Sequence, residues 1–156
     1  MFDKVIFLDF DGVLITRRSR RRWLKLKNRP MLFFKRGCVS ALKAIVKDTG
    51  AKIVVSSTWR RCLDWPRPVF LSFAAVGWVD PPIIDRTPSP LPYTDSDMRG
   101  TDIALWLASN SVSRFLILDD KDDMLPDQMD FFVKISGGNG LTCLYYDKCV
   151  SILGTK

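Results

Sequence analysis

Two aspartates, Asp9 and Asp11, follow a short apolar run and are the first residues in the chain with the chemistry of a reactive centre. Carboxylates this close together repel each other unless a cation lies between them, and hard carboxylate oxygens are ligands that suit Mg²⁺. Gly12 comes next and permits a backbone turn that a side chain would obstruct. The pattern predicts a magnesium site or, more simply, a strand that ends in a solvated Asp-x-Asp-Gly turn.

Polar residues also follow two other apolar runs. Ser56-Ser57-Thr58-Trp59-Arg60 comes directly after residues 53–55, and Asp119-Asp120 comes directly after residues 114–118. If these runs are parallel strands, their carboxyl ends meet at one edge of the sheet, where open α/β folds bind their ligands. This convergence predicts that the polar groups form one site.

Hydrophobic periodicity predicts the elements that would position this site. Helical spacing of apolar residues indicates helices over 37–50 and 101–109, and short β-branched or apolar runs indicate buried strands. The strands are expected at 5–8, 52–55 and 114–118, with smaller ones at 75–79, 131–135 and 141–145. The fold class is therefore α/β, with a mostly parallel central sheet and helices on both faces. The chain of 156 residues is expected to form a single domain, with a proline-rich connection at about 62–98.

Composition excludes several kinds of chemistry. The chain contains no histidine, so Ser-His-Asp and Cys-His catalysis are excluded. Its cysteines lack the paired spacing of a zinc finger, and reduced thiols are expected. No apolar run approaches the ~20 residues that span a bilayer, and no signal peptide is evident. These features predict a cytoplasmic protein with no membrane partner.

Positive charge is concentrated in a basic insert at about 15–37, whose pattern fits either a short helix or a loop. It holds ten Lys or Arg and no acid, while the whole chain has a net charge of +7. The remaining residues carry 14 bases and 17 acids, so the insert lies on a mildly acidic body. This asymmetry indicates an anionic partner at one face, although a solvated basic loop would look the same.

The motifs resemble those of the haloacid dehalogenase-like (HAD) phosphohydrolases. Asp9-Phe10-Asp11-Gly12-Val13 matches the first motif, Ser56 the second, Arg99 at a helix start the third, and Asp119-Asp120 the fourth. Together, residues 56–60, Arg99-Gly100, 118–120 and 140–142 are similar to a narrower group. This group is the small HAD domain associated with RNA-repair proteins, sometimes called the Swiss-army-knife type. The resemblance implies a Rossmann-like HAD fold with a minimal cap.

The resemblance also implies roles for the motif residues. Asp9 would be the nucleophile that forms an aspartyl-phosphate, and Asp11 would serve as general acid and base. Mg²⁺ would be held by the Asp9 carboxylate, the Asp11 backbone carbonyl and the Asp119/Asp120 pair. Ser56 would bind a phosphoryl oxygen, and Arg99 would neutralise charge on the transferring group.

Several neighbouring residues are weaker candidates. The family usually places its cation just before the fourth-motif strand and often uses Lys, so Arg60 and Lys121 compete with Arg99. Ser57 could support the site or merely shape the turn, and Asp123 could help at the metal or belong to a solvated acidic loop. Arg60 could instead pair with Asp64.

The expected function is that of a phosphoric monoester hydrolase. The presence of Asp11 distinguishes the family's phosphatases from its dehalogenases. With little room for a cap, the site is expected to be open and to accept a phosphorylated nucleic-acid end, such as a 3′-phosphate. Substrate-binding candidates lie in the basic insert: Arg17, Arg18, Arg20, Arg21, Arg22 and Trp23, the last through base stacking.

Two alternatives remain open. The enzyme could act instead on nucleotides, other small phosphoesters or a phosphoprotein. The chain could also be a nucleic-acid-binding module on a HAD scaffold with little catalysis. The four aspartates of the first and fourth motifs argue against a pure binding module, which would have no need of them.

Overall fold

The structure is a computed structural model that describes residues 2–25, 33–89 and 98–156, together with the side chains of all of these except 22–25. The elements run in the order β1 (Phe2–Leu8), α1 (Arg17–Lys25), α2 (Arg36–Thr49), β2 (Lys52–Val55), η1 (Thr58–Arg61), α3 (Arg67–Ala74), β3 (Ile83–Arg86), α4 (Arg99–Ala108), β4 (Val112–Asp119), η2 (Pro126–Phe131), β5 (Phe132–Lys134), η3 (Cys143–Tyr145) and α5 (Tyr146–Leu153), where η marks a short 3-10 helix.

The strands form one sheet in the order β3-β2-β1-β4-β5. Every neighbouring pair is parallel, which confirms the predicted α/β class and its parallel sheet. β1 is the central strand, and its Leu8 lies opposite Val55 of β2 and Leu118 of β4. Because the three strands end at or within one residue of these paired positions, the polar residues at their ends gather at one edge of the sheet.

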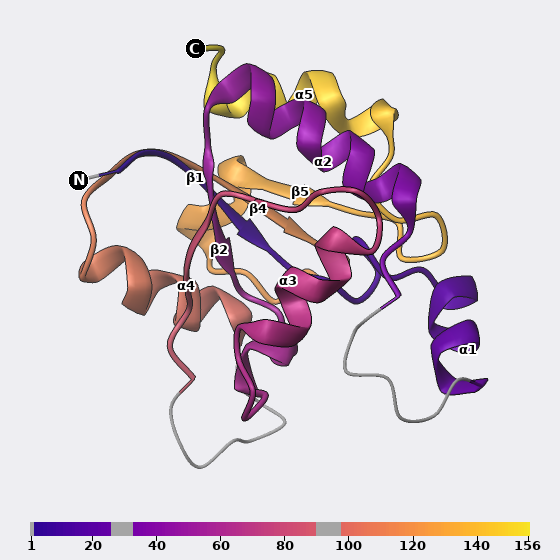
Figure 1. Cartoon of the computed structure of the whole chain (residues 1–156). Coiled ribbons are helices and arrows are strands. Elements are labelled where there is room, and N and C mark those ends of the chain that lie inside the picture. Colours follow the sequence, from indigo (N-terminus) through magenta and orange to yellow (C-terminus); the bar gives the residue numbers. More distant parts are fainter. Residues whose placement is uncertain (1, 26–32, 90–97) are drawn as a thin grey trace.

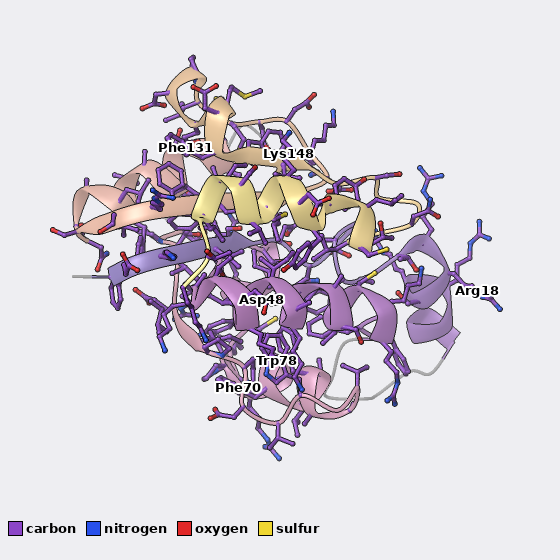
Figure 2. All side chains as sticks on the ribbon, turned by 90° about the horizontal axis from the view of Figure 1, so that it is seen from above. Arg18, Asp48, Phe70, Trp78, Phe131 and Lys148 are labelled. Carbon is purple, nitrogen blue, oxygen red and sulfur yellow. The ribbon has the colours of Figure 1, made fainter. Side chains whose placement is uncertain are left out.

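Helices cover both faces of the sheet, as Figure 1 shows. Alternate residues of β1 point to opposite faces, so Ile6 and Leu8 join one apolar core while Val5 and Phe7 join another. The first core is closed by α2, α3 and α5, and α2 and α5 lie side by side above it (Figure 2). The second core is closed by α4, through Ile103 and Trp106. This two-sided burial explains why β1 is apolar at every position from Val5 to Leu8.

Two of the smaller predicted strands are wrong. Residues 75–79 form a turn after α3, and the strand in this part of the chain is β3 instead. Residues 141–145 lead through η3 into α5. The proline-rich connection also contains more regular structure than predicted, since α3 and β3 both lie within it. Pro68 is compatible with α3 because it falls in the first turn, where a backbone N–H has no helical partner.

The basic insert begins with α1, so the helical alternative is the one the structure has. Thr16 and Ser19 close its first turn by bonding reciprocally: the Thr16 N–H donates to Ser19 Oγ at 2.9 Å, and the Ser19 N–H donates to Thr16 Oγ1 at 3.4 Å. This arrangement satisfies donors that a helix start otherwise leaves free. The rest of the insert up to α2 lies largely outside the described residues.

None of the helices in the described residues combines the length and apolar character needed to cross a bilayer.

The turn before η3 depends on Gly140, which has φ +72°. A Cβ here would lie 2.7 Å from both Cys38 Sγ and the Val13 carbonyl oxygen. We expect Gly140→Ala to lower the free energy of unfolding by about 1–3 kcal/mol, because backbone strain and a steric clash act together. Urea denaturation monitored by circular dichroism measures the change.

Gly138 provides the matched control, since a Cβ there would meet nothing within 4 Å and its φ is not in the left-handed region. Gly138→Ala should change stability by less than about 0.5 kcal/mol. Equal effects of the two substitutions would contradict the role given to Gly140 in the turn.

Candidate active site

The end of β1 delivers Asp9 into the edge of the sheet. The Asp9 N–H donates to the Leu118 carbonyl oxygen at 3.0 Å and so continues the pairing between β1 and β4 by one residue. Asp119, the last residue of β4, therefore lies next to Asp9. Both side chains are buried, since Asp9 is only 3% exposed and Asp119 is 0% exposed. Parallel register alone thus brings together two carboxylates that are far apart in the sequence.

Asp120 completes a cluster of three carboxylates. One oxygen from each of Asp9, Asp119 and Asp120 lies within 4.8 Å of the other two. Asp120 is held between two glycines: a Cβ on Gly12 would lie 2.2 Å from its Oδ2, and a Cβ on Gly137 would lie 2.8 Å from the same atom. The backbone at both positions therefore closes on this carboxylate in a way that only glycine allows.

Burial makes negative charge in this cluster costly. Burial raises the pKa of Asp9 from 3.8 to about 6, although the Arg99 guanidinium partly opposes this. Burial and then the charge of Asp9 raise the pKa of Asp119 to about 8. The residues fit a bound divalent cation, because a hard cation takes carboxylate oxygens as ligands and relieves this repulsion.

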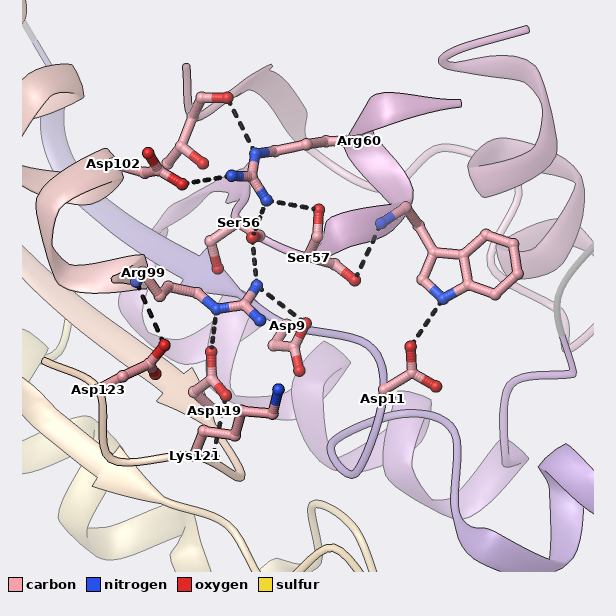
Figure 3. Close-up of polar contacts among 12 residues, drawn as sticks. Asp9, Asp11, Ser56, Ser57, Arg60, Arg99, Asp102, Asp119, Lys121 and Asp123 are labelled. Carbon is pink, nitrogen blue, oxygen red and sulfur yellow. Dashed lines mark hydrogen bonds and ion pairs between the residues drawn. The ribbon is translucent and has the colours of Figure 1, made fainter. Parts of the chain in front are cut away.

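Arg99 is the buried cation of the site. Its Nη1 lies 3.2 Å from Asp9 Oδ1, and its Nε lies 2.8 Å from Asp119 Oδ2. The same Nη1 also donates to the Ser56 carbonyl oxygen. Arg99 is the first residue of α4, so the start of this helix determines where the guanidinium lies (Figure 3).

Asp123 anchors that helix start. Its Oδ2 accepts from the Arg99 N–H at 3.3 Å, and its carbonyl oxygen accepts from the Gly100 N–H at 3.0 Å. An acidic side chain at a helix N-terminus also interacts favourably with the helix dipole. Asp123 therefore supports the site through Arg99 rather than from within the described carboxylate cluster.

Arg60 acts as a buried brace, and its ion-pair partner is Asp102 of α4 rather than the suggested Asp64. Its Nη1 donates to the carbonyl oxygens of Ser56 at 2.7 Å and Ser57 at 3.0 Å, and its Nε donates to the carbonyl oxygen of Thr87 at 3.2 Å. These contacts tie the end of β2 to the end of β3 and to α4. Arg60 thus shapes the loop, while Arg99 is the arginine that contacts Asp9.

The two serines after β2 have different surroundings. Against the burial that raises the pKa of Asp9, a hydrogen bond from the Ser57 hydroxyl acts to lower it, so this side chain reaches the nucleophile candidate. Ser56 Oγ is buried and has no hydrogen-bond partner among the described residues. Of the two hydroxyls, that of Ser57 is therefore the one that bonds Asp9, whereas Ser56 was the one predicted.

Asp11 is held by Trp59, a residue of the 3-10 helix η1 that follows β2. The Trp59 indole Nε1 donates to Asp11 Oδ2 at 2.8 Å. Lys121 acts on the cluster in two ways. Its backbone N–H donates to Asp119 Oδ1 at 3.0 Å, and the charge of its exposed side chain acts to lower the pKa of Asp120, which burial raises.

A pocket of about 420 Å³ opens beside the cluster. Its lining includes two acids, Asp11 and Asp120, and two arginines of α1, Arg17 and Arg20. Arg18 and Arg21 are exposed and do not line this pocket, and the side chains of Arg22 and Trp23 lie outside the described part of the structure. A larger pocket of about 620 Å³ lies near β3 but contains none of the clustered aspartates.

We expect the stability of the metal-free protein to fall by a few kcal/mol as pH rises from about 5 to about 8. The raised pKa values of Asp9 and Asp119 mean that the folded state keeps protons that the unfolded chain has already released. The unfolded state then binds fewer protons, so the free energy of unfolding decreases as pH rises. Urea titrations with a chelator present, repeated across this range, measure the trend.

Mg²⁺ should raise the unfolding temperature more at the upper end of this range, because protons compete with the metal for the carboxylates. Asp119→Asn should flatten the pH dependence, whereas Asp3→Asn, on the exposed part of β1, should leave it intact. A stability that rises with pH over the same interval would contradict the burial cost assigned to the cluster.

Comparison with known proteins adds independent information. A family model described as the HAD domain in Swiss Army Knife RNA repair proteins matches residues 5–143, a range that includes every aspartate of the cluster. Neither the curated proteins nor the solved structures contain a match to the chain. The family match confirms the resemblance found in the sequence motifs. The chain therefore belongs to the HAD domain family of Swiss Army Knife RNA repair proteins.

Proposed function

We propose that this protein is a Mg²⁺-dependent phosphatase that removes a phosphate from a nucleic-acid end, such as a 3′-phosphate. The observation that carries the proposal is the buried Asp9, which lies within 4.8 Å of two further carboxylates and is paired with Arg99. A carboxylate in this setting suits nucleophilic attack on a phosphate, since Arg99 and a cation held by the three carboxylates would counter the charge of a bound phosphoryl group.

The protein's own residues divide the work of such a reaction. Asp9 attacks phosphorus and forms an aspartyl-phosphate, while Arg99 offers a guanidinium to the charge that develops on the phosphoryl oxygens. Ser57 orients Asp9 through its hydroxyl. Asp11 protonates the leaving oxygen and later removes a proton from the attacking water.

Mg²⁺ would be held by the carboxylates of Asp9, Asp119 and Asp120 and by the backbone carbonyl of Asp11. When bound, the ion supplies positive charge that offsets repulsion between Asp9 and an incoming phosphate. The buried, mutually repelling carboxylates support this assignment, since each is costly to ionise without a counter-charge.

The position of α1 supports a polymeric substrate. Arg17 and Arg20 are three residues apart, so they share one side of the helix, and both line the pocket that contains Asp11 and Asp120. A terminal phosphate at Asp9 would therefore have cations available for the neighbouring backbone phosphates. Arg18 points outward from α1 in Figure 2 and offers its charge farther from the pocket.

We expect Asp9→Asn to lower phosphate release by at least about 1,000-fold, because the amide has nearly the same shape but is not a competent nucleophile. The assay measures phosphate released from 3′- and 5′-phosphorylated oligonucleotides, nucleotides and p-nitrophenyl phosphate. Wild-type activity should require Mg²⁺ and disappear in EDTA.

Asp3→Asn makes the same chemical change on the exposed part of β1 and should retain wild-type turnover. Retention of more than a few per cent of activity by Asp9→Asn would remove Asp9 from the nucleophile role. Equal rates on oligonucleotides and small phosphoesters would favour the small-molecule alternative.

Replacement of Arg17 and Arg20 by Ser should raise KM for phosphorylated oligonucleotides and leave p-nitrophenyl phosphate hydrolysis nearly unchanged. A nucleic acid releases counterions when its phosphates meet cations, so affinity falls with salt. For a single strand, the slope of log affinity against log salt should become shallower by about 0.7 per lost contact, or about 1.4 for both.

The double variant Lys43→Ser/Lys47→Ser is the charge-matched control, because both lysines are exposed on α2 and neither lines the pocket. Its salt slope should equal that of the wild type. If the arginine and lysine variants behave alike, α1 contributes only general charge and does not contact the substrate.

A further inference from the structure

We propose that Trp59 is a positioning residue that orients the Asp11 carboxyl for proton transfer, an inference that rests on the phosphatase reaction proposed above. The indole Nε1 of Trp59 donates to Asp11 Oδ2 at 2.8 Å, and a dashed line marks this bond at Asp11 in Figure 3. Trp59 comes from η1 and Asp11 from the turn after β1, so this contact joins the first two motif loops.

The indole is a fixed donor. The Trp59 backbone N–H donates to Ser57 Oγ at 3.5 Å, its carbonyl oxygen accepts from the Cys62 N–H at 3.2 Å, and its ring packs against the main apolar core. Asp11, by contrast, is only half-buried and lines the open pocket. A carboxyl group rotates easily about its last torsion angle unless it is bonded. Trp59 therefore supplies the rigidity that the position of Asp11 lacks.

The hydrogen-bonding capacity of the indole influences which carboxyl oxygen of Asp11 carries the transferable proton. An indole N–H donates hydrogen bonds and cannot accept them. In a carboxylic acid the carbonyl oxygen accepts hydrogen bonds better than the hydroxyl oxygen, so the bond from Trp59 to Oδ2 favours the acid proton on Oδ1. The contact thus reserves Oδ1 for the exchange of protons with substrate and water.

Both proton transfers then use the same oxygen. In the first, the bond from phosphorus to the leaving oxygen breaks as the bond to Asp9 forms, and the leaving oxygen keeps the electron pair and takes the proton of Oδ1. In the second, water attacks phosphorus, the bond to Asp9 breaks, and the proton of the water passes to Oδ1. Trp59 touches none of the reacting atoms and acts only through Asp11.

The same turn also reaches the nucleophile. Ser57 accepts the Trp59 N–H, and its hydroxyl bonds Asp9. The chain of contacts from Asp9 through Ser57 and Trp59 to Asp11 means that η1 sets the positions of both reactive carboxyls together. A shift of this turn would misplace the two groups at once.

The test uses Trp59→Phe and a series of phosphate monoesters whose leaving groups range from dinitrophenol to an alkyl alcohol or ribose. kcat/KM covers the steps up to departure of the leaving group, so it reports the first proton transfer alone. General acid catalysis is worth about 10²–10⁴-fold. We expect a loss of about 10–100-fold for alkyl phosphates and less than about threefold for dinitrophenyl phosphate, whose leaving group departs without a proton.

Trp78→Phe is the matched control. Trp78 is 8% exposed and packs against Phe73 in the core, with ring centroids 5.4 Å apart, and it is not among the residues that line the pocket beside the cluster. Its effect should be the same for every leaving group. An equal loss across the series in Trp59→Phe would overturn the proposal and leave Trp59 with a purely structural role.

A second measurement does not depend on activity or on the folding of the Trp59 variant. In the ¹H–¹⁵N spectrum, the Trp59 indole signal should move when Asp11 is changed to Asn, because its carboxylate partner is lost, while the Trp78 signal should stay in place. An unmoved Trp59 signal would overturn the contact itself. If the wild-type chain hydrolyses no phosphomonoester, the proposed function fails with this role, whereas an active enzyme with uniform losses refutes only the role of Trp59.

Discussion

The site depends on one electrostatic constraint, the burial of adjacent carboxylates at the end of parallel strands. Asp9 and Asp119 are brought together by backbone pairing between β1 and β4, with little water to screen them. Arg99 forms ion pairs with both Asp9 and Asp119, so its guanidinium provides a buried counter-charge for these carboxylates. A guanidinium suits this position because it stays charged when buried and offers several donors in one plane.

The contacts around Arg99 connect the start of α4 to the end of β2. Asp123 holds the first backbone N–H groups of α4, and Ser56 offers its carbonyl oxygen to the guanidinium. Arg60 donates to the same Ser56 carbonyl oxygen and forms an ion pair with Asp102, which is one helical turn beyond Arg99 on α4. Two buried arginines thus connect β2 and α4, so the position of Asp9 follows from the packing of the fold.

Sequence patterns predicted the elements whose buried residues follow a clear apolar pattern. The strands β1, β2 and β4 were found because a continuous apolar run between polar residues is typical of a buried strand. The helix α2 was found because apolar residues at helical spacing are typical of an amphipathic helix. β3 was missed because it is an edge strand whose residues are mostly exposed, and its Ile83–Arg86 run lacks alternation. Residues 141–145 were assigned to a strand because a short run of apolar and aromatic residues does not distinguish strand from helix.

The same limits apply to the site. The aspartates of the first and fourth motifs were predicted because strand ends share an edge, which is a property of the topology. The choice between Ser56 and Ser57 depends on which way one side chain turns after the last residue of β2, and neighbouring polar residues do not reveal that. The bond between Trp59 and Asp11 links side chains from two loops, and nothing in the spacing of these residues indicates it.

The central position of β1 has a consequence for how the protein is made. Of the five strands in the sheet, β1 leaves the ribosome first, yet its partner β4 ends at Asp119, so the segment between the two strands must be synthesised before both edges of β1 are paired. Long-range parallel pairing of this kind forms slowly, because loop closure precedes the contacts that reward it. During synthesis, Asp9 therefore stays an ordinary hydrated carboxylate, and burial raises its pKa only when the sheet closes around it.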